Sequence, residues 1–250
     1  SIMHLPLQAY LSRTLCYFYL AILALYAGEA ASLTYTVEVL DTQPHNPNSF
    51  TQGWIKHQDD FYESSGHYGR SFIQRYSDSP ASTPATTASI PKRYFAEGLT
   101  LFNNTLYLLT WKEETLLLLD KNNLQIKQTL PYQGEGWGLT HNGEELIMSN
   151  GSDTLFFREP THFKVTRHIT VNLPLRLNEL EYVNGIIWAN SWYDDQLYAI
   201  NSHNGCVLGT LDLAHLRAQI VTPNKRNVLN GIAYDKARNG LWVTGKYWPK

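Results

Sequence analysis

The sequence repeats one short pattern five times, and this repeat limits the possible folds more than any other feature. Each unit begins with a strand-like segment whose equivalent positions are Gln52, Glu97, Trp137, Asn178 and Asn230. Successive members of this set lie 45, 40, 41 and 52 residues apart. A second strand-like run follows each segment about ten residues later, after a short turn. A period of this length indicates an array of similar supersecondary units.

Two further strand-like runs follow in most units, so that four short strands make up one repeat. This arrangement is typical of a β-propeller blade. We therefore expect an all-β, five-bladed β-propeller, with four-stranded antiparallel blades around a central channel, over residues 33–250. No window of useful length shows the helical period of about 3.6 residues. Residues 77–85, which are rich in Ser, Pro and Thr, are expected to form a long loop within the first blade.

The fifth unit is incomplete, because the sequence stops soon after its second strand. The alternating residues 34–40 can supply an outer strand that closes the ring. A third strand for this blade is still missing from the pattern. We therefore expect the domain to be truncated at its C-terminus.

Residues 1–32 are interpreted as a signal peptide or an N-terminal anchor. Residues 15–27 read LCYFYLAILALYA without a charge, Arg13 precedes them, and small residues follow. This order is typical of a secretory signal, and the apolar run is shorter than the roughly 20 residues of a membrane span. We expect the protein to be secreted or periplasmic.

Composition excludes two broad classes of protein. The formal net charge of -2 offers no basic surplus to neutralise phosphates, so we expect no nucleic-acid partner. A hydrophobic content of 43% at low net charge excludes intrinsic disorder. Sixteen Tyr and seven Trp favour β-structure and an aromatic pocket.

Equivalent positions of the repeat converge on the channel of a propeller, which turns the register into a site prediction. The first set consists of the five residues that define the repeat. Counting fourteen residues forward, with two more for the longer turn of the fifth unit, gives a second set: Gly66, Trp111, Gly151, Trp192 and Lys246. One acid, one lysine, three indoles and three amides at such positions indicate a small-molecule pocket with an acid–base group. The alternative is that the indoles fill the channel as packing and the amides fix strand ends.

Glu97 and Lys246 are the candidate acid–base groups. Beside channel-facing indoles, Glu97 would be partly desolvated, which raises the pKa of its carboxyl group toward the range of a general base. Lys246 is placed in the channel by its register alone. Further acids near the inner strands are Glu63, Glu135, Glu179 and Glu181, and the sequence does not say which of them point inward. His67 follows the inner strands of the first blade and could reach the mouth of the channel, although we expect it at the surface. No nucleophile elbow, phosphate loop or zinc motif occurs.

Six motifs resemble the plant and bacterial type of glutaminyl-peptide cyclotransferase (glutaminyl cyclase). They are Phe50-Thr51-Gln52-Gly53, residues 95–100 (FAEGLT), 109–112 (LTWK), 134–140 (GEGWGLT), 177–182 (LNELEY) and 245–249 (GKYWP). The resemblance runs from about Tyr35 to Lys250, in order and at matching spacing. It implies a five-bladed propeller and the conversion of N-terminal glutamine to pyroglutamate with release of ammonia.

The resemblance also implies a role for each matching residue. Its catalytic group is Glu97 as acid and base, with Asn178 and Lys246 as donors to the developing oxyanion. Its substrate-binding residues are Phe50, Gln52, Phe95, Trp111, Trp137 and Trp192. It implies no required cofactor and no catalytic metal, and it allows a structural calcium ion without naming ligands. The implied partners are peptides and proteins with N-terminal glutamine, and we expect a monomer with no membrane contact beyond the N-terminal segment.

Two other functions remain open from the residues alone. A calcium-dependent, lactonase-like propeller hydrolase could bind the ion through Glu97, Asn178 and Asn230, although a lysine at the same level would repel it. A non-catalytic propeller could bind partners on one face.

Overall fold

The computed structural model describes residues 2–4, 33–77, 86–220 and 226–250, in which the strands form five sheets. The first contains β4 (Thr51–His57), β5 (Asp60–Ser65), β6 (Phe72–Ser77) and β7 (Thr86–Ser89). The second contains β8 (Ala96–Phe102), β9 (Thr105–Thr110), β10 (Thr115–Asp120) and β11 (Ile126–Pro131). The third contains β12 (Leu139–His141), β13 (Leu146–Met148), β14 (Thr154–Arg158) and β15 (Val165–Thr170).

The other two sheets also recruit strands from the N-terminal part of the chain. The fourth contains β16 (Leu177–Val183), β17 (Ile186–Ser191), β18 (Gln196–Asn201), β19 (Val207–Asp212) and β2 (Leu33–Tyr35). The fifth contains β20 (Leu229–Asp235), β21 (Gly240–Gly245), β1 (Ile2–His4) and β3 (Val39–Asp41). Pairing is antiparallel except between β19 and β2, which are parallel.

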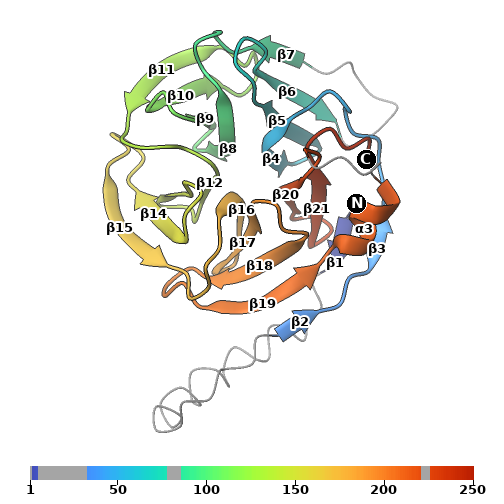
Figure 1. Cartoon of the computed structure of the whole chain (residues 1–250). Helices are drawn as coiled ribbons and strands as arrows, with labels where there is room; N and C mark the ends of the chain where they lie inside the picture. The colour runs from blue at the N-terminus through green and yellow to red at the C-terminus, as the bar shows by residue number, and fades with distance from the viewer. Residues whose placement is uncertain (1, 5–32, 78–85, 221–225) are drawn as a thin grey trace, which may run out of the picture.

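The sheets are arranged around a common centre, as Figure 1 shows. The first strands of the five sheets, β4, β8, β12, β16 and β20, contact one another in cyclic order, and β20 contacts β4. Later strands of each sheet lie progressively farther out. The fold is therefore an all-β, propeller-like fold with four-stranded antiparallel blades, as the repeat predicted.

The fifth sheet differs in detail from the prediction. Its outermost strand is β3, which overlaps the predicted range 34–40 only at residues 39 and 40, whereas Leu33–Tyr35 joins the fourth sheet instead. The third position, which the repeat left empty, is taken by Ile2–His4, paired with residues 240–242 of β21. These three residues belong to the segment interpreted as a signal peptide. The rest of that segment (5–32) and the predicted loop at 78–85 lie outside the described residues.

The core fills the spaces between neighbouring sheets. Strand β10 reads Thr-Leu-Leu-Leu-Leu-Asp; Leu117 and Leu119 pack with the first sheet, whereas Leu116 and Leu118 pack toward the third. Successive side chains of a strand point to opposite faces. A strand buried on both faces therefore needs a continuous apolar run, as seen in parallel sheets and in propeller blades alike.

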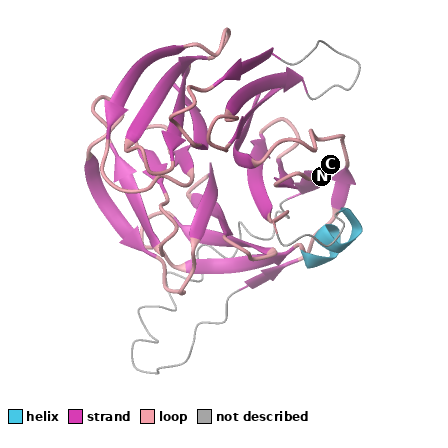
Figure 2. Ribbon diagram, turned by 45° about the horizontal axis from the view of Figure 1, so that its top comes forward, coloured by secondary structure: helices cyan, strands magenta, loops and turns pink. Residues whose placement is uncertain are grey.

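One helix is present among the described residues, α3 (Ala214–Ile220), which Figure 2 shows at the edge of the molecule. Asp212 Oδ1 caps it by accepting from the N–H of Ala214 at 2.9 Å, and Leu216 is buried. Seven residues are too few for a helical period to stand out in the sequence. Within the described residues, no helix is long and apolar enough to cross a membrane.

Candidate functional site

Four of the five first-set residues lie in the same irregularity of their inner strand. Strand pairing skips a residue or more around Gln52, Glu97, Asn178 and Asn230, which is the mark of a β-bulge. A bulge leaves the extra residue outside the hydrogen-bond ladder and redirects its side chain. All four are buried. The sequence repeat therefore corresponds to a β-bulge that recurs in four of the inner strands. Each bulge carries one of the polar first-set side chains.

The second set also shares a backbone contact. The N–H groups of Gly66, Trp111, Trp192 and Lys246 each donate to the carbonyl oxygen two residues before the first-set residue of their own sheet, at 2.8 to 3.1 Å. The third sheet is the exception, because Gly151 donates to Leu177 instead. The predicted register is thus confirmed in four sheets, including Lys246, for which the longer turn required a correction of two residues.

The two glycines of the second set provide space for aromatic rings. A Cβ atom on Gly66 would clash with the Phe95 ring at 2.4 Å, and one on Gly151 would be 2.6 Å from the Trp137 indole. Side chains at these positions would displace two of the predicted pocket residues. Gly151 also has φ +81°, a conformation that glycine adopts without strain.

Glu97 lies in a largely dry environment. Its side chain is 5% exposed, and Gln52 Nε2 is 3.4 Å from its Oε1. Burial raises the pKa of Glu97 well above its usual value; the charge of Lys246 opposes this shift, and the charges of Glu113 and Glu135 add to it. The result is a carboxyl group whose protonated form is favoured by burial.

Lys246 is the cationic counterpart of Glu97. It is 5% exposed, and its Nζ lies 4.3 Å from the centre of the Phe50 ring, a cation–π contact. Burial lowers the pKa of Lys246 to about 8, while the charge of Glu97 acts in the opposite direction. The predicted placement of this residue away from the surface is confirmed.

Aromatic contacts join the remaining predicted residues into two groups. Phe50 and Phe95 meet edge to face with centroids 6.4 Å apart, and Phe95 meets Trp111 at 5.3 Å. Trp137 and Trp192 are perpendicular at 5.8 Å. Such edge contacts stabilise ring orientations beyond the burial of their area.

Polar oxygens of the amides remain unsatisfied inside this region. Gln52 Oε1, Asn178 Oδ1 and Asn230 Oδ1 are buried and have no hydrogen-bond partner. Asn230 Nδ2 does donate to the carbonyl of Thr51 at 2.8 Å, so this side chain also ties two sheets together. Buried groups without partners are costly. Their clustering at first-set positions marks where a polar ligand would be accepted.

Asn178 reaches the other predicted residues through the backbone. Its carbonyl oxygen accepts from Ser149 Oγ at 2.5 Å and lies so close to Gly138, next to Trp137, that a Cβ there would not fit. The contact of Gln52 with Glu97 joins the first sheet to the second, and ring contacts join Phe50 to Phe95, Phe95 to Trp111 and Trp137 to Trp192.

Two residues at the site were not identified from the sequence as members of it. Glu135 Oε2 accepts from both Trp111 Nε1 and Trp137 Nε1, and the guanidinium of Arg176 lies 4.2 Å from the centre of the Trp192 ring. Both stand two residues before a first-set residue, as Phe50 and Phe95 do. Extending the register argument by this offset would have found them.

The expectation that His67 is a surface residue was wrong. It is partly buried, its ring centre is 4.5 Å from that of Phe50, and its Nε2 lies 2.9 Å from Tyr247 Oη. The hydroxyl group and the ring hold the Phe50 side of the pocket next to the segment that carries Lys246.

The other candidate acids are structural. Glu63 accepts from His45, Thr51 and Tyr76 and is fully buried. Glu179 accepts from the N–H of Ile232 at 2.7 Å, and Glu181 from that of Tyr234 at 2.9 Å, so both carboxyl groups join the fourth sheet to the fifth.

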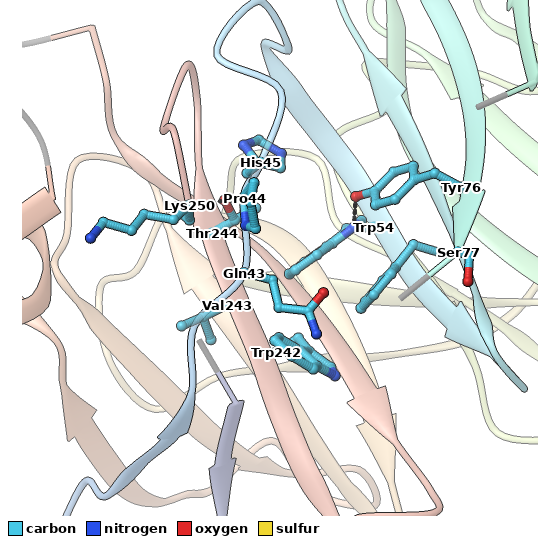
Figure 3. Close-up of a pocket in the computed structure, with 11 residues that line it drawn as sticks. Gln43, Pro44, His45, Trp54, Tyr76, Ser77, Trp242, Val243, Thr244 and Lys250 are labelled. Atoms are coloured by element: carbon cyan, nitrogen blue, oxygen red, sulfur yellow. Dashed lines mark hydrogen bonds between the residues drawn. The ribbon is translucent and has the colours of Figure 1, made fainter. Parts of the chain in front are cut away.

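A cavity of about 190 Å³ lies apart from the predicted residues. Figure 3 shows it between β21, the first sheet and the segment around Pro44, with the indoles of Trp54 and Trp242 in its walls. No first-set or second-set residue lines it. Its walls are mainly apolar, and acid–base chemistry is better supported around Glu97.

A metal site built from side chains requires several ligating groups close together. Among the residues that the structure describes, no group of three or more His, Cys, Asp or Glu side chains is placed to hold a metal ion. We therefore name no ligands for the calcium ion that the resemblance allows.

Comparisons with known proteins agree with the geometry. A protein 35% identical over 235 residues is the glutaminyl-peptide cyclotransferase of Arabidopsis thaliana; the match covers 90% of this chain and 73% of that protein. The crystal structure of Myxococcus xanthus glutaminyl cyclase matches with a TM-score of 0.76 and 35% identity, over 82% of this chain and 90% of that one. A Bacteroides caccae protein of unknown function shares only the fold, with a TM-score of 0.50 and 14% identity over 64% of this chain and 66% of that one. A family model described as glutamine cyclotransferase matches residues 14–250. The chain belongs to the glutamine cyclotransferase family.

Proposed function

We propose that this chain converts the N-terminal glutamine of peptides and proteins to pyroglutamate and releases ammonia, with Glu97 as the acid–base group. The family and both relatives support the reaction. The observation that carries the residue assignment is the buried carboxyl group of Glu97, whose pKa is raised and on which the charge of buried Lys246 acts, two residues after Phe95 in the contacting Phe95–Trp111 pair.

The reaction needs one proton moved twice. The α-amine attacks its own γ-carboxamide carbon, a C–N bond forms, and Glu97 takes the proton that the amine loses. Glu97 then gives this proton to the amide nitrogen, the original C–N bond breaks, and ammonia leaves. Glu97 therefore has the same charge before and after the reaction. Because its side chain carries out both proton transfers, we propose no cofactor.

The oxygen of the γ-carboxamide gains negative charge in the intermediate. Lys246 and the amide of Asn178 are the proposed donors to it; such donors act strongly where water is excluded. The indoles of Trp111, Trp137 and Trp192 and the rings of Phe50 and Phe95 are proposed to hold the substrate folded and dry. Gln52, which contacts Glu97, is proposed to orient the base.

The ring closes within one residue, so the pocket has to accept only the first residue of the substrate. We propose that five blades close the propeller ring, supported by five sheets whose first strands contact in a cycle. We also propose that the protein acts as a monomer outside the cytoplasm, on the pattern of residues 1–32.

The direct test is cyclisation of a peptide that begins with glutamine, followed by the mass loss of ammonia, with wild-type protein and Glu97→Gln. We expect turnover by the wild type and a loss of at least 100-fold in the variant. A variant within tenfold of the wild type would overturn the role of Glu97. No product with the wild type would favour a binding protein, and loss of activity with a chelator would favour the calcium-dependent hydrolase.

A further inference from the structure

Two indoles in the site donate hydrogen bonds to the same carboxylate, that of Glu135. Glu135 Oε2 accepts from Trp111 Nε1 at 3.0 Å and from Trp137 Nε1 at 2.9 Å. Trp111 follows β9 of the second sheet, and Trp137 precedes β12 of the third, so this single oxygen joins two neighbouring blades. Hydrogen bonds to an ionised acceptor are roughly twice as strong as neutral ones.

The backbone places Glu135 for this contact. The N–H of Gly136 donates to the carbonyl oxygen of Trp111 at 2.9 Å, and the N–H of Trp137 donates to that of Ser149 at 3.1 Å. The chain immediately after Glu135 is therefore fixed to both blades. The third sheet lacks the backbone bond that each of the other four makes within itself at this level. The Glu135 side chain makes a different connection, from the second sheet to the third.

The other contacts of the two indoles are made by their rings, among them that of Tyr68 with Trp111. Trp111 contacts the edge of Phe95, and Lys112 Nζ lies over its ring at 4.2 Å, yet Lys112 is exposed. Trp137 rests on Gly151 and meets Trp192 edge to face. The only polar atom of an indole is its N–H, and a hydrogen bond from it limits rotation of the ring.

We propose that Glu135 is a positioning residue for the proposed cyclisation: it holds Trp111 and Trp137 in the orientation that encloses the folded glutamine. The inference rests on the proposed function. Glu135 acts through the indoles and not on the reacting atoms. Its reach, meaning the distance from backbone to carboxyl oxygen, is what matters for this role.

Glu135 has a second, separable effect through its charge. The charged groups that act on Glu97 are Lys246, Glu113 and Glu135, and Tyr68 and Tyr132 are coupled to Glu97 as well. Loss of the negative charge at position 135 lowers the pKa of Glu97. Charge and reach can therefore be changed one at a time.

Three substitutions separate the two effects. Glu135→Asp keeps the charge and shortens the reach, Glu135→Gln keeps the reach and removes the charge, and Glu135→Ala removes both. We expect kcat/KM to fall at least tenfold in the Asp and Ala variants and less than threefold in Gln at its optimum pH. The acid limb of the pH profile should move to lower pH in Gln and Ala but stay in place in Asp. Glu144→Gln, an exposed turn residue, is the control.

A spectroscopic measurement of the two indoles tests the proposal independently of enzyme turnover. The indole N–H signals of Trp111 and Trp137, assigned with Trp→Phe variants in ¹⁵N-labelled protein, should shift in the Asp and Ala variants and return toward wild type in Gln. Unchanged signals in Ala, or full activity in Asp together with loss in Gln, would overturn the proposal. If the wild-type protein were inactive while the signals still shifted in the Asp and Ala variants, the result would refute the proposed function and leave the role of Glu135 in orienting the indoles intact.

Discussion

Gln52 Nε2 lies 3.4 Å from Glu97 Oε1, and both side chains come from bulges in the inner strands of adjacent sheets. The other polar atom of this amide, Gln52 Oε1, is buried without a partner. The amide therefore touches the candidate base with its donor and presents its acceptor to whatever occupies the pocket.

Replacing this amide should weaken catalysis moderately. We expect Gln52→Ala to lower kcat/KM about 2- to 10-fold, the value of one neutral hydrogen bond. Gln52→Glu should lose more, because a second carboxylate raises the pKa of Glu97 further. Steady-state kinetics on a glutamine-initiated peptide measure both. Equal rates for the wild type and both variants would show that Gln52 does not act on Glu97.

Lys246 should set the alkaline limit of activity. Its pKa of about 8 means that its ammonium group, the proposed donor, is present below that pH and is lost above it. We expect kcat/KM to decline above about pH 8 and to fall roughly 100-fold or more in Lys246→Met. In the same variant the acid limb should move to higher pH, because the charge of Lys246 lowers the pKa of Glu97.

The comparison with Lys246→Arg checks this assignment. Arginine stays protonated throughout, so any residual activity of that variant should show no decline near pH 8. An alkaline limb unchanged in Lys246→Arg would assign the titration to another group.

The His45–Glu63 pair should make stability depend on pH. Their side chains meet at 2.8 Å, and His45 also contacts the carbonyl oxygen of Trp248. Burial lowers the pKa of His45, but the charge and hydrogen bond of Glu63 outweigh it and raise the pKa above 6.5. Burial raises the pKa of Glu63, and the charge of His45 with three hydrogen bonds brings it below 4.5.

The sign for each partner follows from these directions. The stabilisation from His45 is complete below pH 6.5 and is lost as pH rises through its folded-state pKa. That from Glu63 is complete above pH 4.5 and is lost as pH falls through its folded-state pKa. The pair contributes most between these values. Glu63→Gln should cost about 3 kcal/mol of unfolding free energy there, as measured by urea unfolding; a cost that is the same at pH 5.5 and about pH 9 would contradict the linkage.

Glu181 should have the opposite effect on stability. Burial raises its pKa to about 8, so its folded form keeps a proton that the unfolded chain releases above about 4.5. This group therefore costs stability as pH rises from 4.5 to 8. Glu181→Gln, which resembles the protonated form, should raise the unfolding free energy at pH 8 by about 1 kcal/mol or more and flatten its pH dependence. Lower stability at pH 8 would show that the carboxylate is charged in the fold.

The first-set and second-set positions could be predicted because a sequence repeat identifies equivalent positions without any knowledge of contacts. The spacing alone placed Glu97 and Lys246 in one region, although 149 residues separate them. It could not find the joint action of Glu135 on two indoles, because that contact depends on side-chain direction and not on register. The third strand of the fifth sheet was also missed, since Ile2–His4 carries no repeat motif and pairs across almost the whole length of the chain.

The shared bulge has a consequence for how such a site can change. Residues in the ladder are constrained by their backbone partners, whereas the four bulged residues, Gln, Glu, Asn and Asn at one equivalent position, stand outside this pairing. Selection for folding therefore acts on the flanking residues, while selection for chemistry acts on the bulge. A propeller of this type can acquire a new reaction through single substitutions at positions that its strand pairing already leaves unconstrained.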